Sequence, residues 1–298
     1  MSFSSAYLLI SHGSRDPRPQ QAMEELAERV ATQLGHREWR PGGQGGSKYT
    51  RPLISPISHL QPPKPSQELL LRTRDWSFQV EAKLVTARAT MVSRTYYPLV
   101  GTATLELAEA PLHEQIRQFA SAALAEGCNH LQLLPLFLLP GVHVREDIPT
   151  EVALAQQYLG KAVILNLRPH VGTHPGLGKL LASQWALVDV DAKILLSHGS
   201  RRIGGNEPVE VVAQQLGAVA AYWSVQPTLE EQVKVLVAAG HKRIGILPYF
   251  LFPGGITDAI AQRVGSLQAE FPKVRLNLGE PIGVSSELAN LIVDLVEQ

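Results

Sequence analysis

The chain has 298 residues with 27 basic and 27 acidic side chains, so its formal net charge is zero at pH 7. This balance predicts no electrostatic attraction to nucleic acid or to an acidic membrane surface. The single cysteine, Cys128, excludes an internal disulfide framework and a cysteine-cluster metal site. There is no basic leader segment, and no apolar run approaches the roughly 20 residues that span a bilayer. We therefore expect a cytoplasmic protein without a membrane or nucleic-acid partner.

The first regular pattern predicts a strand, a loop and a helix. A short apolar run at residues 6–11 reads as a strand, and His12 follows it directly. Asp16 can cap a helix, and Pro17 suits the first helical position because its missing N–H has no partner there. Apolar residues then recur with helical spacing and predict a helix that ends at Gly35. His12 therefore lies in the loop of a strand–loop–helix unit.

The pattern breaks down between about residues 36 and 95. A glycine-rich stretch at 42–46 and a proline-rich stretch at 62–65 stand among scattered polar residues, a composition that cannot build a core. Residues 67–97 mix strand-like alternation with a helical turn. We predict a flexible surface insertion over 36–95 and assign it no chemistry.

Regular patterns return after residue 98. An apolar run at 99–108 predicts a strand whose end carries Glu106. A second run, at 130–139, carries no charge after its first residues and predicts a strand buried on both faces, as is usual in a parallel sheet. A Pro-Gly break follows this run, and His143 lies just beyond it. The remaining predicted elements are helices at 111–126, at 147–158 and from His174 onward, and a strand at 162–167.

The second half of the chain repeats the first. The sequence ILLSHGSR at residues 194–201 corresponds to LLISHGSR at residues 8–15. Residues 247–254 correspond to residues 134–141 without a gap. Matches that occur in the same order indicate an internal duplication.

A duplicated chain of this length predicts two domains. We place them at residues 1–186, with the insertion, and at residues 187–298. Each strand–helix series is typical of an α/β, Rossmann-like domain with a small, mostly parallel sheet. The two domains would be related by a pseudo-two-fold axis within a monomer.

Three polar groups follow strand ends in the first copy: His12, Glu106 and His143. If the strands are parallel, all three lie at one edge of one sheet, where open α/β sheets bind their ligands. Two imidazoles and a carboxylate suit a divalent metal such as Fe, Co, Ni or Zn. They equally suit proton transfer near neutral pH. A loop histidine that only hydrogen-bonds to the backbone is the simpler alternative for His143.

The second copy changes this set of residues. His198 repeats His12, but Ile256 stands where the first copy has His143. Aligning the two copies also places Ser224 opposite Glu106. A site that needs all three groups is therefore predicted in the first copy only, and His198 is predicted to be a loop residue or part of a cleft wall.

Three motifs resemble those of the sirohydrochlorin chelatases, the CbiX/SirB type of class II chelatase. They are SHGSRDP at residues 11–17, LELA at residues 105–108 and PLFLLPGVHVREDIP at residues 135–149. The third motif is long and specific, and the resemblance covers nearly the whole chain outside the insertion.

The resemblance implies two chelatase domains that face each other across a central cleft. It also implies a lyase that inserts Fe²⁺ or Co²⁺ into sirohydrochlorin without ATP, in siroheme or cobalamin biosynthesis. Carried over to this sequence, the metal-handling groups are His12, His143 and Glu106. The substrate's carboxylates would be bound by Ser14, Arg15 and Arg145, and Arg18 is a further cationic partner near the first motif. No cofactor is implied beyond the substrate metal, and Fe²⁺ and Co²⁺ suit the same ligands.

Two other functions use the same residues. A non-catalytic carrier of a divalent metal or a tetrapyrrole would need the same ligands without turnover. The order strand, Ser-His-Gly, helix is also similar to the opening of the histidine phosphatases, but Ser11 replaces the arginine that grips phosphate there. The sequence favours the chelatase over both.

Overall fold

A computed structural model describes residues 4–38, 98–185 and 189–297. These residues belong to one compact unit. Most of the predicted insertion, from residue 39 to residue 95, lies outside the described residues, so its structure stays a prediction.

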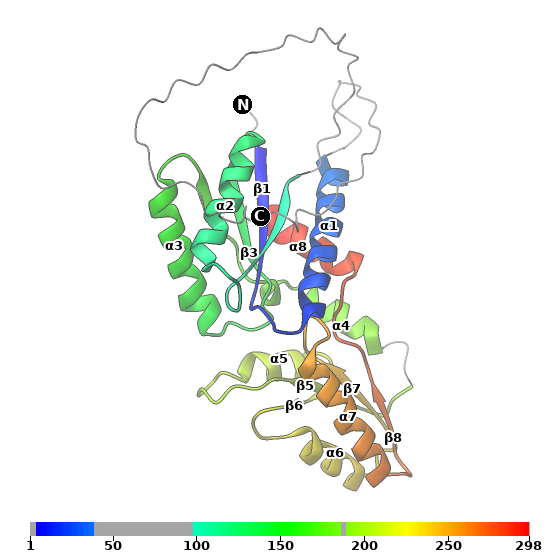
Figure 1. Ribbon diagram of the computed structural model, residues 1–298. Helices are drawn as coiled ribbons and strands as arrows, with labels where there is room; N and C mark the ends of the chain where they lie inside the picture. Colours follow the sequence, from blue (N-terminus) through cyan, green and yellow to red (C-terminus); the bar gives the residue numbers. More distant parts are fainter. Residues whose placement is uncertain (1–3, 39–97, 186–188, 298) are drawn as a thin grey trace, which may run out of the picture. The chain divides into compact units, whose positions relative to one another are not determined.

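The first copy forms a four-stranded parallel sheet (Figure 1). Its strands lie in the order β2-β1-β3-β4, so β1 and β3 are central and are flanked on both sides. Central position explains why their sequences are nearly continuous apolar runs. The strands are β1 (Ser4–Ser11), β2 (Val100–Thr104), β3 (Cys128–Pro135) and β4 (Ile164–Leu167).

The second copy repeats this sheet with the same topology, β6-β5-β7-β8, and the same parallel pairing. The register also repeats, because Tyr249 N donates to Leu196 O at 2.7 Å as Leu136 N donates to Ile10 O at 2.7 Å. The predicted α/β class and duplication are therefore confirmed. The strands are β5 (Ala192–Ser197), β6 (Val219–Tyr222), β7 (Arg243–Pro248) and β8 (Arg275–Leu278).

Helices connect the strands in both copies. They are α1 (Pro17–Glu38), α2 (Leu112–Ala125), α3 (Ile148–Leu159), α4 (Leu177–Trp185), α5 (Glu207–Gln215), α6 (Leu229–Ala238), α7 (Gly255–Glu270) and α8 (Ser286–Glu297). A π-helical turn, η1 (His143–Asp147), precedes α3, and a 3₁₀ turn, η2 (Val171–Thr173), precedes α4. Within the described residues no helix has the length and apolar character to cross a membrane.

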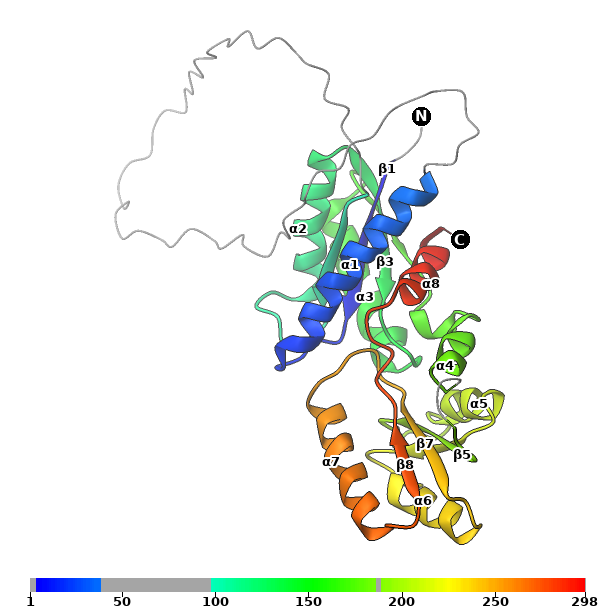
Figure 2. The same cartoon turned by 90° about the vertical axis from the view of Figure 1, so that its right-hand side faces the viewer.

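Each sheet buries both faces under helices. The first sheet packs against α2 and α3 on one face and against α1 and α8 on the other (Figure 1). The second sheet packs against α6 and α7 on one face and against α5 on the other (Figure 2). Alternate residues of the central strands point to opposite faces, so that Leu8 joins one core and Leu9 the other.

The last helix of the chain packs on the first sheet. Arg37 of α1 donates to Asp294 at 2.6 Å and to Glu297 at 2.9 Å, both on α8. Arg168, which follows β4, donates to Val296 O at 3.0 Å. One hydrophobic cluster therefore runs through both copies. The boundary between residues 186 and 187 stays a prediction, because the two copies share this core.

Three predicted boundaries need correction. The first helix does not end at Gly35 but continues to Glu38, since the ion pairs of Arg37 offset the cost of about 1 kcal/mol for a helical glycine. The strand predicted at 99–108 ends at Thr104, so Glu106 lies two residues beyond it. The strand predicted at 130–139 ends at Pro135.

The residues after Pro135 remain apolar for a different reason. Leu136 N makes the last bond to β1, and the side chains of Leu136 and Leu138 pack into the cluster that both copies share. The backbone of this segment is held by the turn after β4, where Gly172 N donates to Phe137 O at 2.9 Å. Apolar character here therefore reflects burial in a loop rather than strand pairing.

Candidate active site at the carboxyl edge of the first sheet

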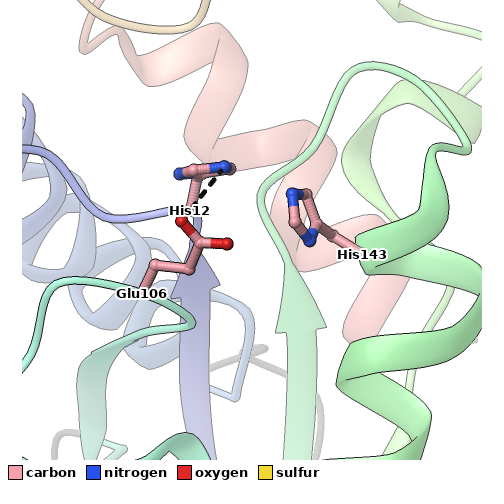
Figure 3. Close-up of side chains that lie close together, drawn as sticks. All are labelled: His12, Glu106 and His143. Atoms are coloured by element: carbon pink, nitrogen blue, oxygen red, sulfur yellow. Dashed lines mark ion pairs between the residues drawn. The ribbon is translucent and has the colours of Figure 1, made fainter.

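His12, Glu106 and His143 lie together (Figure 3). Each offers one ligand atom, and these atoms all lie within 4.8 Å of one another. His12 Nε2 is 3.9 Å from Glu106 Oε2. The two imidazole rings meet edge to face, with centroids 4.8 Å apart and an interplanar angle of 83°. Three groups that are separated in the sequence thus converge at the carboxyl edge of the first sheet.

The separations suit a single ion after small side-chain rotations. Two ligands bound at about 2.1 Å to the same ion are at most about 4.2 Å apart. The side chains of His12 and Glu106 are 51% and 50% exposed, so nothing rigid opposes such a rotation. The open side also leaves coordination positions for water or for a second ligand.

Gly13 allows the loops after β1 and β2 to approach each other. Its φ is +100°, in the left-handed region, and an added Cβ would stand 2.0 Å from Glu106 O. Glu106 N donates to His12 O at 2.9 Å across this approach. A side chain at residue 13 would therefore push Glu106 away from His12.

His143 is oriented by a carboxylate that the sequence analysis missed. Its Nδ1 donates to Asp147 Oδ2 at 2.7 Å within the π-helical turn η1. This bond fixes the tautomer and leaves the Nε2 lone pair for a metal. His143 and Asp147 are four residues apart in a segment predicted to begin a helix, and this spacing could have predicted their contact.

Phe137 closes the apolar side of the site. Its ring centroid is 6.4 Å from that of His12 and 6.2 Å from that of His143. An aromatic ring beside two imidazoles offers a flat apolar surface, but it cannot coordinate a metal. Sequence reasoning placed Phe137 in a strand and so missed it.

The predicted substrate-binding residues lie on the same edge. Arg15 and Arg145 are exposed, and neither has a carboxylate partner within the described residues. The Ser14 hydroxyl accepts a hydrogen bond from Asp16 N at 3.0 Å, which gives it a structural role in the turn.

Arg18, in contrast, is committed to an ion pair. It lies between Asp16, at 2.5 Å, and Asp258 of α7, at 2.6 Å. The guanidinium group lowers the pKa of both carboxyls, mainly through hydrogen bonds, and the pKa of Arg18 is raised in turn. This pair links the carboxyl edges of the two sheets.

The second copy keeps the backbone hydrogen bonds of these loops but lacks two of the three metal-ligand side chains. Ser224 N donates to His198 O at 2.9 Å, as Glu106 N does to His12 O, so Ser224 occupies the place of Glu106. The Ser224 hydroxyl donates to His198 O at 2.8 Å. Ile256, opposite His143 in the alignment, lies in the first turn of α7. The metal-ligand cluster found among the described residues is the one in the first copy.

His170 and His174, four residues apart, support the backbone after β4 rather than a metal. His170 is buried and donates from Nδ1 to Phe137 O at 2.9 Å, and burial lowers its pKa. His174 Nδ1 accepts from Gly176 N at 2.9 Å. They hold a turn and a helix entry and form no ligand pair.

Comparison with known families agrees with this geometry. The model of the CbiX family matches residues 73–186 and 192–298, the two copies in turn. The chain belongs to the CbiX family. The resemblance read from the three motifs is thereby confirmed, and the family match covers both halves of the duplication.

Curated relatives include enzymes of both metal specificities. A sirohydrochlorin ferrochelatase of Priestia megaterium is 24% identical over 186 residues, which is 58% of this chain and 68% of the relative. A sirohydrochlorin cobaltochelatase of the same organism is 23% identical over 216 residues, 67% of this chain and 69% of the relative. The chain is thus similar to a ferrochelatase and to a cobaltochelatase at nearly the same identity.

Solved structures share the fold over nearly the full length. SirB from Bacillus subtilis with Fe³⁺ superposes with a TM-score of 0.64 at 19% identity, covering 99% of this chain and 95% of that one. A CbiX structure described as the terminal enzyme for the biosynthesis of siroheme in denitrifying bacteria has a TM-score of 0.54 at 17% identity, with 98% of both chains covered. The tandem arrangement of two parallel sheets is therefore the family's fold.

Proposed function

We propose that the protein inserts Fe²⁺ or Co²⁺ into sirohydrochlorin as a chelatase of the lyase class. The observation that carries this proposal is the convergence of His12, Glu106 and His143 at one sheet edge, in a chain of the CbiX family. The metal is a substrate, so it must be held firmly enough to lose water and loosely enough to be released into the macrocycle. Two imidazoles and a half-exposed carboxylate meet both needs.

His12 and His143 hold the incoming metal in this mechanism. Both act as neutral imidazoles, the form required of a ligand. The hydrogen bond from His143 to Asp147 keeps the Nε2 lone pair available. The edge-to-face rings and Phe137 leave one side open, where the tetrapyrrole approaches with its nitrogen lone pairs.

Glu106 takes up protons during the exchange. Insertion of a divalent ion releases two protons from the pyrrole nitrogens, and these need a nearby acceptor. The Glu106 carboxylate is 50% exposed and 3.9 Å from His12, so it can pass a proton to solvent. Part of the binding energy of the substrate would be used to distort the macrocycle. This distortion would turn a nitrogen lone pair toward the metal.

The proposal includes no ATP and no cofactor beyond the substrate metal. Ser14, Arg15 and Arg145 are proposed to bind the peripheral carboxylates of the substrate, with the arginines contributing most. A monomeric state and a cytoplasmic location remain predictions.

The experiment combines purified protein with sirohydrochlorin and either Fe²⁺ or Co²⁺, and follows the absorption spectrum of the macrocycle. We expect a shift that depends on the protein, and a loss of nearly all of it in His143→Ala. Full activity of His143→Ala would contradict the assignment. Metal binding without metallation of sirohydrochlorin would favour the carrier function, and hydrolysis of a generic phosphate ester would favour the phosphatase. Comparing steady-state rates with the two ions identifies the preferred metal.

A further inference from the structure

Unpaired arginines gather at the carboxyl edges of the two sheets. Six arginines of the described residues pair with carboxylates: Arg18, Arg29, Arg37, Arg117, Arg243 and Arg263. Six have no carboxylate partner within the same residues: Arg15, Arg145, Arg168, Arg201, Arg202 and Arg275. Arg168 donates instead to Gln132 Oε1 and Val296 O, and Arg275 lies at the opposite end of its sheet, at the start of β8. Arg15, Arg145, Arg201 and Arg202 lie beside the histidine loops. Cations left unpaired at a site indicate an anionic ligand.

Arg201 and Arg202 stand on a loop that the chain closes by its own hydrogen bonds. Ser200 N donates to Asn206 Oδ1 at 2.8 Å, and Asn206 Nδ2 donates back to Ser200 O at 3.1 Å. Gly205 N donates to Arg202 O at 3.0 Å across the tip. The backbone is therefore ordered while both guanidinium groups remain exposed. Such a loop presents two cations without a loss of backbone entropy on binding.

The duplication shows which properties of this loop differ between the copies. Arg201 has the position of Arg15, three residues after the histidine. Arg202 has the position of Asp16, so a carboxylate that pairs with Arg18 in the first copy is replaced in the second by a cation with no carboxylate partner in the described part of the chain. The second copy has lost two metal ligands and gained a positive charge at the same edge.

The residues that follow this loop lie against the segment that leads to His143. The last turn of the loop leads into Pro208 of α5, which lines a pocket of about 200 Å³ together with Pro140, three residues before His143. The ion pair between Arg18 and Asp258 joins the same two edges at 2.6 Å. A macrocycle at the cluster would thus have its rim close to the second copy.

Charge balance favours the second copy for binding carboxylates. Arg15 and Arg145 share their edge with Glu106, Glu146 and Asp147, which repel an anionic rim. Beside Arg201 and Arg202 the nearby acid is Glu207, and it forms no ion pair with either arginine within the described residues. The carboxylates at the first edge repel the carboxylates of the substrate and weaken its binding, and cations at the second edge would offset this repulsion.

We propose that Arg201 and Arg202 bind peripheral carboxylates of the tetrapyrrole, so that the second copy adds two substrate-binding cations to Arg15 and Arg145 of the first. This inference rests on the proposed function. The first copy then provides the metal ligands, and both copies provide cations for the carboxylates of the substrate.

The test measures equilibrium binding of metal-free sirohydrochlorin to the full chain by its absorption change. The double variant Arg201→Ala/Arg202→Ala should bind it at least about tenfold more weakly, because each charge-assisted hydrogen bond contributes strongly. In turnover the KM for sirohydrochlorin should rise while kcat stays within about twofold. Arg275→Ala, which removes an equally exposed and unpaired arginine from the same sheet, is the matched control and should change neither. Arg201→Lys/Arg202→Lys should recover part of the affinity.

Two further measurements separate the possible failures. Co²⁺ binding without tetrapyrrole should be the same in the double variant and the wild type; its loss would show that the loop acts on the fold, and would overturn the proposal. The methyl ester of sirohydrochlorin should bind weakly, and equally weakly to wild type and double variant. A double variant that behaves like Arg275→Ala while the wild type is active overturns this inference alone. A wild type that neither binds nor metallates sirohydrochlorin overturns the proposed function.

Discussion

The carboxyl edges of the two sheets share a backbone and differ in their side chains. After β1 and after β5 the same hydrogen bond of 2.9 Å joins the histidine carbonyl to the loop after the neighbouring strand. Gly13 and Gly199 both take positive φ, at +100° and +86°. Yet the first edge carries His12, Glu106 and His143, and the second carries His198, Ser224 and Ile256. The backbone of these loops therefore forms without His143 and Glu106. Because the fold does not require these side chains, we infer that they serve the function.

The helices that follow β3 and β7 differ as well. In the first copy the helix begins with a π-helical turn that contains both His143 and Asp147. In the second copy α7 begins directly as an α-helix at Gly255. Such π-turns are rare and often occur at functional sites, because they place side chains where a regular helix does not. The position four residues after Ile256 is Ile260, which is buried, so the second copy also lacks the orienting carboxylate.

The largest expected difference between the copies comes from the equivalent histidines. His12→Ala should lower the rate of metallation of sirohydrochlorin by roughly a hundredfold or more, since it removes a metal ligand beside the proton acceptor. His198→Ala removes an imidazole from the same backbone position without a ligand set around it, and should lower the rate by less than about fivefold. The initial rate of the spectral change measures both. Equal losses would show that the two edges contribute alike to the chemistry.

A smaller effect is expected from the residue that orients His143. Asp147→Asn should reduce metal affinity or activity by about 10- to 100-fold, the usual consequence of removing the carboxylate partner of a ligating histidine. Glu146→Gln, the adjacent exposed carboxylate, is the control and should leave activity within about twofold. Co²⁺ titration and turnover measure the two quantities. An Asp147→Asn enzyme with wild-type Co²⁺ affinity and rate would show that the 2.7 Å bond has no role in the site.

The missing ligands can be restored in the second copy. Ser224→Glu with Ile256→His should create a second Co²⁺ site next to His198 and raise the binding stoichiometry from one to two ions per chain. We expect the new site to be weaker than the first by about 10- to 100-fold, since Ile260 replaces the orienting carboxylate. Equilibrium dialysis gives the stoichiometry. If only one ion still binds, the two edges differ in backbone geometry more than their hydrogen bonds indicate.

The smallest expected effect concerns pH and stability. Burial lowers the pKa of His170 in the folded protein, while the unfolded chain titrates at about 6.5. Below that pH the unfolded state binds more protons than the folded state, so His170 makes stability fall as the pH is lowered. His170→Asn keeps a donor for Phe137 O but does not titrate. Its melting temperature should therefore fall less than that of the wild type between pH 7.5 and pH 5.5, and an equal fall would contradict the assignment.

Much of the fold could be predicted from local patterns. The buried character of β1, β3, β5 and β7 follows from uncharged runs, and the repeated motifs predict two sheets with one topology. The ends of the strands were harder to predict from the sequence. Residues 136–139 are as apolar as the strand before them, although they pack in a loop. Gly35 gave a false helix end, because tertiary ion pairs of Arg37 outweigh the preference of one glycine.

The chemistry-bearing side chains were also visible in the sequence. His12, Glu106 and His143 each follow an apolar run, and parallel strands bring such positions to one edge. Aligning residues 221–224 with residues 103–106 further predicted that Ser224 would replace Glu106, and the hydrogen bond from Ser224 N to His198 O confirms this pairing. What the sequence determined by itself is therefore the list of groups at the edge and their loss in the second copy.

Only the tertiary structure decided how these groups meet. The bond between His143 and Asp147, the contact of Phe137 with both imidazoles and the close approach of Gly13 to Glu106 depend on backbone geometry that no periodicity encodes. The ion pair of Arg18 depends in the same way on Asp258, 240 positions away, whereas Arg201 meets no carboxylate among the described residues. Periodicity reports which face of an element is buried, whereas distances and partners arise when separate elements pack together, and those contacts determine the site.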